Sequence, residues 1–168
     1  MILKIHRPII DKAAMFFKGA GRDIYLVGGY LRDAAILRRR WSLRKMGLAG
    51  EAQQAVDIDF AVDKDSIALA REFADKENGS FVLLDEPHGT ARVVFAEKTG
   101  LLQLDFADFR GRDIEEDLKG RDFTFNSMAL RLGKREAVID PLGGMKDMKR
   151  KLIRASSERA FRDDPARV

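Results

Sequence analysis

The sequence predicts an α+β domain in which about five strands form a sheet and helices gather on one face. Two observations predict it. Several short segments alternate apolar and polar residues, which is the period of a strand, and other segments carry apolar residues at helical spacing. Three of the strand-like segments follow one another between 80 and 109, whereas helical segments separate the others. Strands and helices grouped in this way are typical of the α+β class.

Each element is predicted from its own period, in chain order. Apolar spacing of 3.6 residues predicts helices at 9–21, 30–47 and 65–79. Alternation bounded by turn residues predicts strands at 23–29, 56–62, 80–86, 91–97 and 101–109. Further on we expect 114–132 to be helical in its later part, 136–144 to be a short strand, and 145–168 to form helical pieces.

Composition limits the possible classes of protein. The chain has 168 residues, enough for one ordinary domain, and 45% of them are hydrophobic, which argues against global disorder. It has no cysteine, which excludes disulfides and thiolate metal sites. No apolar run approaches the roughly 20 residues that span a bilayer, and no secretory signal is present. We therefore expect a cytoplasmic protein, whose net charge of +4 permits a polyanionic partner.

Two acids stand on the polar side of the predicted strand 56–62. Residues two apart in a strand point to the same side, so Asp57 and Asp59 share a face with Cβ atoms roughly 7 Å apart. A hard divalent cation such as Mg²⁺ would offset their repulsion. The alternative is the solvent-facing side of an edge strand. Asp105 repeats this pattern in the strand 101–109, either as a third ligand of a two-metal site or as a surface residue.

The glycine pair Gly28–Gly29 lies between a predicted strand and a predicted helix. Glycine allows close approach of the backbone to a phosphate, and a helix N-terminus favours anions. Arg32 lies one turn further on and would fork onto phosphate oxygens, with Asp33 orienting it or capping the helix. The alternative is a tight turn that needs a positive φ.

Taken together and in this order, four segments resemble one family. They are "LVGGYLRD", "VDIDF", "GRDFTFNSMA" and "DPLGGMKDMKRKLIR". The set is similar to the head domain of tRNA nucleotidyltransferases and bacterial poly(A) polymerases, which are class II members of the polymerase-β-like nucleotidyltransferase superfamily. The resemblance runs from about Ile24 to Val168. It implies a mixed or antiparallel sheet with helices on one side.

The resemblance also implies roles for particular residues. Asp57 and Asp59 would be catalytic residues that bind Mg²⁺, and Asp105, from its place in the strand 101–109, is the candidate third catalytic ligand of the two-metal site. The triphosphate of CTP or ATP would be held by Gly29 and Arg32, with Gly28 and Asp33 beside them. The remaining nucleotide contacts would be Arg121, Asp122, Asn126, Asp164 and Arg167. The reaction would add nucleotides to the 3′ end of tRNA or another RNA, with release of pyrophosphate.

Three departures from the family pattern refine this expectation. The segment 38–55 lengthens the spacing between Gly29 and Asp57; it is basic, and we favour an extended helix with a packed Trp41 over an RNA contact. The link between the third acidic strand and "EEDL" is short, which within the family is associated with CC addition. The third departure concerns the C-terminal part. We expect a catalytic head at 1–141 and the start of a helical neck at 142–168, which stops before the base-selecting and tRNA-binding regions of the family.

Three alternative functions remain open at this point. A poly(A) polymerase that extends RNA 3′ ends shares every motif named above. A noncatalytic RNA-binding module would keep the fold but is expected to lose the three carboxylates, which are all present. A small-molecule nucleotidyltransferase shares the glycine start and the paired acids, but "RDFTFNSMA" and "DPLGG" argue against it.

Overall fold

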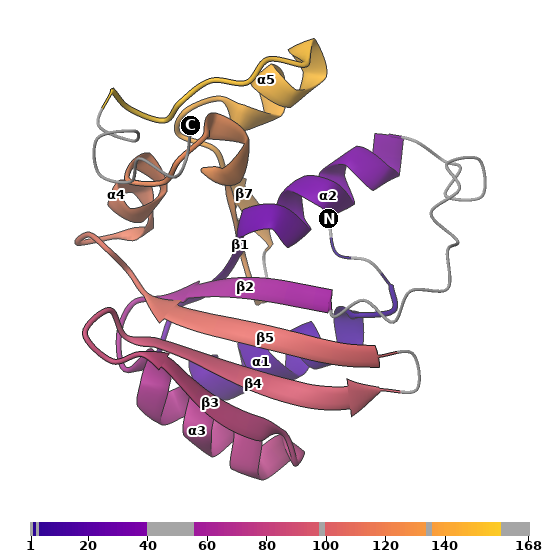
Figure 1. Cartoon of the computed structure of the whole chain (residues 1–168), viewed down its shortest axis with the longest axis vertical. Helices are drawn as coiled ribbons and strands as arrows, with labels where there is room; N and C mark the ends of the chain where they lie inside the picture. Colours follow the sequence, from indigo (N-terminus) through magenta and orange to yellow (C-terminus); the bar gives the residue numbers. More distant parts are fainter. Residues whose placement is uncertain (1, 3, 40–55, 98–99, 134–135, 159–168) are drawn as a thin grey trace.

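The computed structural model describes residues 2, 4–39, 56–97, 100–133 and 136–158, and the account below concerns these residues (Figure 1). Their helices are α1 (Arg7–Gly19), α2 (Gly28–Arg39), α3 (Ser66–Glu77), α4 (Ile114–Lys119) and α5 (Gly144–Arg150), with a 3-10 helix, η2, at Thr124–Asn126. Their strands are β1 (Ile24–Val27), β2 (Val56–Val62), β3 (Ser80–Asp85), β4 (Thr90–Glu97), β5 (Gly100–Asp108), β6 (Ala129–Arg131) and β7 (Ala137–Ile139). None of these helices has the length and apolar character needed to cross a membrane.

The described strands form one mixed sheet in the order β3-β4-β5-β2-β1-β6-β7. The pair β2–β5 is parallel, and every other neighbouring pair is antiparallel. The parallel pair is possible because α3, β3 and β4 lie between β2 and β5 in sequence and return the chain to the end of the sheet where β2 begins. This pair lies in the interior of the sheet, so β2 has neighbours on both sides.

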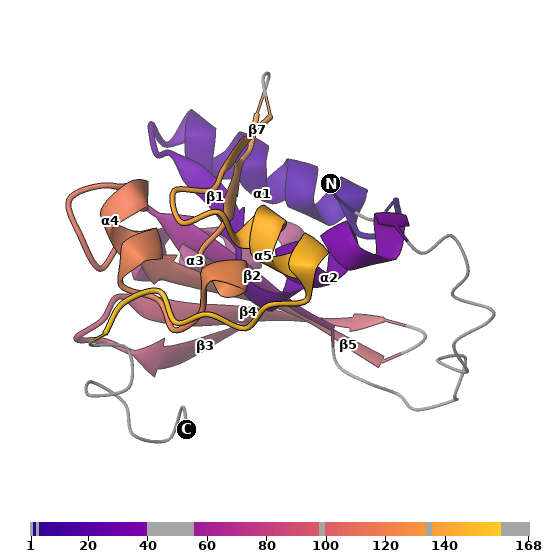
Figure 2. The ribbon, with the colours of Figure 1, turned by 90° about the horizontal axis from the view of Figure 1, so that it is seen from above.

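One face of the sheet carries the main hydrophobic core. Ile58 and Phe60 of β2 are register partners of Leu104 and Phe106 of β5, and all four are buried. Phe60 and Phe106 stack with ring centroids 5.0 Å apart. Helices α1 and α3 cover this face, and Figures 1 and 2 show them together on one side of the strands. Each large side chain buried there contributes about 1.5–3 kcal/mol to folding.

On the opposite face, α4 packs over one end of the sheet. Ile114 and Leu118 of α4 are buried with Tyr25 and Val27 of β1 in a second, smaller cluster. The rest of this face carries the acidic residues of β2 and β5, because strand alternation places them opposite the core. The predicted α+β class is confirmed, with α1 and α3 on one face as expected and α4 added on the other.

Three local expectations about the strands and helices were wrong. Helical pieces were expected over 145–168, but α5 ends at Arg150 and the described residues 151–158 form no helix. The sheet has seven strands rather than about five. The segment 114–132 is helical in its earlier part, at α4, whereas its later part forms η2 and then β6. Met128, Ala129 and Leu130 favour helix by intrinsic propensity, but the pairing of Ala129 and Leu130 with β1 and β7 and the burial of all three side chains override it.

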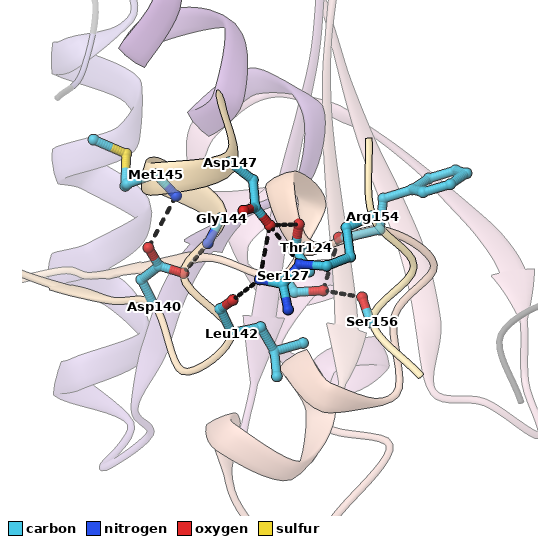
Figure 3. A network of polar contacts seen from close by, with 10 residues as sticks. Thr124, Ser127, Asp140, Leu142, Gly144, Met145, Asp147, Arg154 and Ser156 are labelled. Carbon is cyan, nitrogen blue, oxygen red and sulfur yellow. Dashed lines mark hydrogen bonds and ion pairs between the residues drawn. The ribbon is translucent and has the colours of Figure 1, made fainter. Parts of the chain in front are cut away.

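A network of polar contacts ties α5 to η2 (Figure 3). The Asp140 carboxylate accepts hydrogen bonds from the backbone N–H groups of Gly144, at 2.6 Å, and Met145, at 3.0 Å. These bonds satisfy two of the free donors at the start of α5. Gly144 itself lies so close to η2 that a Cβ atom on it would be 2.1 Å from the Thr124 carbonyl oxygen.

The buried carboxylate of Asp147 is the centre of the same network. It accepts hydrogen bonds from the Thr124 hydroxyl, at 2.7 Å, and from Nε of Arg154, at 2.9 Å. These contacts hold the pKa of Asp147 below its usual range, the Thr124 hydrogen bond contributing most. Arg154 also donates to the Leu142 carbonyl at 2.6 Å, so the turn before α5, the helix and the segment after it are joined to η2.

Replacing Gly144 with alanine is expected to destabilise the protein by about 2–3 kcal/mol, because the new methyl group would overlap backbone atoms that cannot rotate away. The matched control is Gly19→Ala, since a Cβ at Gly19 meets nothing within 4 Å. That change should stay within about 0.5 kcal/mol. Urea unfolding of both variants measures the difference, and equal costs would contradict the close packing of α5 on η2.

The second prediction concerns His6, which is buried beside Tyr30 with its Nδ1 3.0 Å from the tyrosine hydroxyl. Burial lowers the pKa of His6, and the charge of Glu97 opposes this only in part. A lowered pKa means that the unfolded chain binds more protons below about pH 6.5, so stability falls as the pH falls through that range. His6→Gln should flatten the decline in unfolding free energy between pH 7 and 5.5, measured by urea titration. An unchanged slope would contradict this.

Candidate active site

Three acids lie on the face of the sheet opposite the main core, as the alternation predicted. Asp59 of β2 is the register partner of Asp105 of β5, and Asp57 of β2 faces Gln103 of β5. Asp57 is exposed, while Asp59 and Asp105 are half-buried. Because β2 is an interior strand, the alternative of a solvent-facing edge strand does not apply to this pair.

The charges on this face act strongly on one another. Burial raises the pKa of Asp59, and the neighbouring charge of Asp105 raises it further. The Arg121 guanidinium opposes both, and Arg92 of β4 opposes them more weakly. Arg92 is also the direct partner of Asp105, through Nε–Oδ1 at 2.6 Å and Nη2–Oδ2 at 2.7 Å. These hydrogen bonds, with smaller effects from the charges of the other two acids, raise the pKa of Arg92.

The glycine pair begins α2 rather than preceding it. Gly28 has φ of 70°, so the alternative reading of a position that needs positive φ is correct for this residue. A Cβ on Gly28 would lie 2.4 Å from Oδ2 of Asp59, and the close approach leaves no room for a side chain. The N-terminal turn of α2 therefore lies directly against the acidic face.

Arg32 extends from this first part of α2 towards η2. Its Nε donates to Asp33 at 2.7 Å, and its Nη1 donates to Oδ1 of Asn126 at 2.9 Å. The Asn126 amide nitrogen in turn donates to the carboxylate of Asp122, at 3.2 and 3.3 Å. The guanidinium also lies 5.9 Å from the centroid of the Phe125 ring. This chain of contacts joins two segments that are far apart in sequence and fixes the direction of Arg32.

Arg121 is held by a buried acid of α4. Its Nε and Nη2 donate to Oδ2 of Asp117 at 3.1 and 2.9 Å. Oδ1 of Asp117 accepts the backbone N–H of Arg110 at 3.1 Å. Asp117 is only 4% exposed, so its charge depends on protein donors rather than on water. Among the described residues, those donors are Arg110 and Arg121. Asp117 therefore fixes the position of Arg121, a role for which the four-residue spacing between the two was the available sequence signal.

A cavity of about 350 Å³ opens between the acidic face and these arginines. It brings together most of the residues that the sequence singled out. Those lining it are Gly28, Gly29, Arg32, Asp59, Asp105, Arg121, Asp122 and Asn126. Asp57 and Asp33 are not among its lining residues, and Asp164 and Arg167 lie outside the described part of the chain. Acids on the strands thus face cations on α2 and after α4, an arrangement suited to a ligand that carries both metal ions and phosphate.

Sequence reasoning missed several residues of this cavity. Thr90, Asp108, Arg110 and Asp117 line it as well. Arg92 supplies a cation to the same face, and one signal could have found it: it is a lone charged residue among apolar neighbours in "ARVVF". Within the described residues, no three Asp, Glu or His side chains converge as a ready-made metal cluster.

Comparison with known proteins gives a consistent result. The family model described as "Poly A polymerase head domain" matches residues 24–154. The CC-adding tRNA nucleotidyltransferase of Geobacter sulfurreducens is 35% identical over 164 residues, which cover 98% of this chain and 34% of that protein. The A-adding tRNA nucleotidyltransferase of Deinococcus radiodurans is 39% identical over 143 residues, covering 85% of this chain and 28% of that protein. The chain thus spans about a third of the length of these curated relatives.

Solved structures resemble the same region. A Thermotoga maritima CCA-adding enzyme complexed with tRNA has a TM-score of 0.76 at 30% identity, covering 99% of this chain and 36% of that one. A tRNA nucleotidyltransferase complexed with a primer tRNA and an incoming ATP analogue has a TM-score of 0.69 at 32% identity, covering 92% of this chain and 42% of that one.

Removing the charge of Asp117 by Asp117→Asn is expected to destabilise the protein by about 2–3 kcal/mol, because the amide loses the buried negative charge and turns one acceptor oxygen into a donor that faces other donors. Glu115→Gln is the control on the same helix: Glu115 is exposed and lies 3.6 Å from Lys119, so its change should be about 0–1 kcal/mol. Thermal and urea unfolding provide the measurement. Similar costs for the two variants would contradict the role given to Asp117.

Proposed function

The chain belongs to the family of the poly(A) polymerase head domain, and from this we propose that it is the catalytic head of a template-independent RNA nucleotidyltransferase. The proposed reaction adds nucleotides to the 3′ end of tRNA. The terminal ribose 3′-hydroxyl attacks the α-phosphorus of CTP or ATP, the bond from that phosphorus to the bridging oxygen breaks, and pyrophosphate leaves. The tRNA nucleotidyltransferases to which the chain is similar support this choice of substrate.

One observation carries the proposal. Asp59 and Asp105 are register partners on neighbouring parallel strands, and both line a cavity whose other wall holds Arg32 and Arg121. A nucleoside triphosphate needs both sides of such a cavity, since its phosphates require cations and its metal ions require oxygen ligands. A noncatalytic module would have no use for carboxylates held so close together against their own repulsion.

The donor set fits Mg²⁺. Asp57, Asp59 and Asp105 offer only carboxylate oxygens, the ligands that this ion takes together with substrate phosphates. Burial raises the pKa of Asp59, and the neighbouring charge of Asp105, which a bound cation would offset, raises it further. When bound, the ions would lower the pKa of the attacking hydroxyl and neutralise the leaving phosphates.

The remaining roles belong to residues of the chain itself. We propose that Gly28 and Gly29 let the triphosphate approach the backbone at the start of α2, because the first N–H groups of a helix have no partner within the helix. Arg32, directed by Asp33 and Asn126, would bind phosphate oxygens. Arg121 would bind the nucleotide from the other side, with Asp122 supporting Asn126. Asp164 and Arg167 stay predictions for the same site.

The short link between β5 and α4 supports a narrower proposal. Residues 109–113 alone join these two elements, and we propose CC addition, with CTP as the substrate. The relatives include CC-, A- and CCA-adding enzymes, so similarity by itself does not choose among them. Poly(A) synthesis stays the alternative, since the family model carries that name. The boundary of the head at residue 141 and the cytoplasmic location also stay proposals.

Asp59→Asn is expected to lower nucleotide addition by at least about 100-fold, because the carboxylate beside the reacting phosphate is lost while the side-chain shape is kept. Pyrophosphate release by the full-length gene product is measured with Mg²⁺, tRNA lacking its CCA end, and CTP or ATP supplied separately. Asp57→Ala should have the same effect. Asp23→Asn is the control, since Asp23 pairs with Arg131 away from the cavity.

Each outcome decides between the functions considered. Release with CTP that does not increase when ATP is added afterwards supports CC addition, and an increase supports CCA addition. Release with ATP on a tRNA that already ends in CC supports A addition, and ATP use on an unrelated RNA supports poly(A) synthesis. Activity that survives both Asp59→Asn and Asp57→Ala would contradict the carboxylate assignment. No release with any combination of tRNA, RNA and nucleotide would contradict the proposed function itself.

A further inference from the structure

Arg92 is a cation built into the acidic face, and the roles proposed above do not use it. It lies on β4 as the register partner of Asp105 on β5. Its guanidinium binds both oxygens of the Asp105 carboxylate, at 2.6 and 2.7 Å. The side chains are 29% and 19% exposed, so the pair is partly shielded from water. A bidentate pair of this kind is stronger and more directional than a single contact.

The contacts of Arg92 engage both carboxylate oxygens of Asp105, which another cation would need as ligands. Both carboxylate oxygens already accept a hydrogen bond from the fork, and no three acids of the described chain converge as a metal cluster. A third nitrogen, Nη1, donates to the side chain of Gln103, two residues before Asp105 on β5. Arg92 would therefore keep one partner on the same strand if it released Asp105.

We propose that Arg92 is the resident counter-cation of the acidic face and competes with divalent cations for Asp105. The proposal rests on the proposed function, because it assigns Asp105 to metal binding. A metal ion that ligates Asp105 must displace at least one arm of the guanidinium and approach a fixed positive charge. Arg92 thereby offsets part of the negative charge of the face when no metal is bound, and the affinity of the face for metal is lower than three free carboxylates would give.

Competition predicts a definite sign for the effect of removing Arg92. Arg92→Gln should bind Mn²⁺ about five- to tenfold more tightly in the absence of nucleotide, because a unit positive charge near a partly exposed site is gone. The metal-free variant should melt at a lower temperature than wild type, since the acids lose their counter-charge. Saturating Mn²⁺ should narrow that difference. A residue with a purely structural role would lower the melting temperature without changing the affinity for metal.

The experiment is isothermal titration calorimetry of Mn²⁺ into nucleotide-free protein, with thermal melting measured in parallel. Arg92→Lys keeps the positive charge but loses the two-pronged contact, so its affinity for Mn²⁺ should lie between those of wild type and Arg92→Gln. If Arg92→Gln does not fold, the comparison of Arg92→Lys with wild type replaces it. Arg131→Gln, which removes an exposed arginine paired with Asp23, is the matched control and should bind Mn²⁺ as wild type does. Asp59→Asn should weaken Mn²⁺ binding, and this loss would show that the measured heat comes from metal binding at the acidic face.

The outcomes separate this inference from the proposed function. Tighter binding in Arg92→Gln with an unchanged Arg131→Gln supports competition. Equal or weaker binding in Arg92→Gln, with Mn²⁺ still bound by wild type, overturns the inference and leaves the proposed function intact, because Arg92 would then orient Asp105 for the ion or be indifferent to it. No Mn²⁺ binding by any form, even with nucleotide present, overturns both.

Discussion

The parallel pairing of β2 with β5 is the constraint on which the rest of this structure depends. Its register sets two phenylalanines and their aliphatic neighbours together on one face, and by the same alternation sets Asp59 beside Asp105 on the other. A shift of one residue in either strand would bury carboxylates and expose the aromatic core. Burial of Phe60 and Phe106 therefore enforces the proximity of two like charges, and the folding energy of the core offsets their repulsion.

The cationic wall of the cavity depends on a different kind of interaction. Arg32 and Arg121 belong to separate segments, and each is directed by neighbouring polar groups rather than by packing. Asn126 connects Arg32 to η2, and the Asp147 network anchors η2 to α5. A disturbance at α5 would thus reach Arg32 through a short series of hydrogen bonds. The acidic wall has no such dependence, since it is part of the sheet.

The sequence predicted the acidic half of the site better than the cationic half. Alternation alone placed Asp57 and Asp59 on one strand face and suggested Asp105 as a neighbour, because strand geometry constrains side chains by position. The pairing of Arg92 with Asp105 was not predictable, since it depends on the register between two strands, which no local pattern encodes. Asp117 and Arg121 are four residues apart, so their pairing had a local signal, but their meeting with the acidic face had none. The strand β6 was missed for a related reason: its residues favour helix locally, and only pairing with β1 makes them a strand.

The crossover that makes β2 and β5 parallel also has a consequence for how the chain folds. The hairpins β3–β4 and β4–β5 join residues that are close in sequence, whereas β2 must wait for α3, β3 and β4 before it meets β5. Closing such a long loop has an entropy cost that is recovered only when the pairing is complete, so topology of this kind slows folding. The strand that carries Asp57 and Asp59 thus meets β5 later than β3, β4 and β5 meet one another. A chain in which only this meander has formed would still hold Asp59 and Asp105 apart.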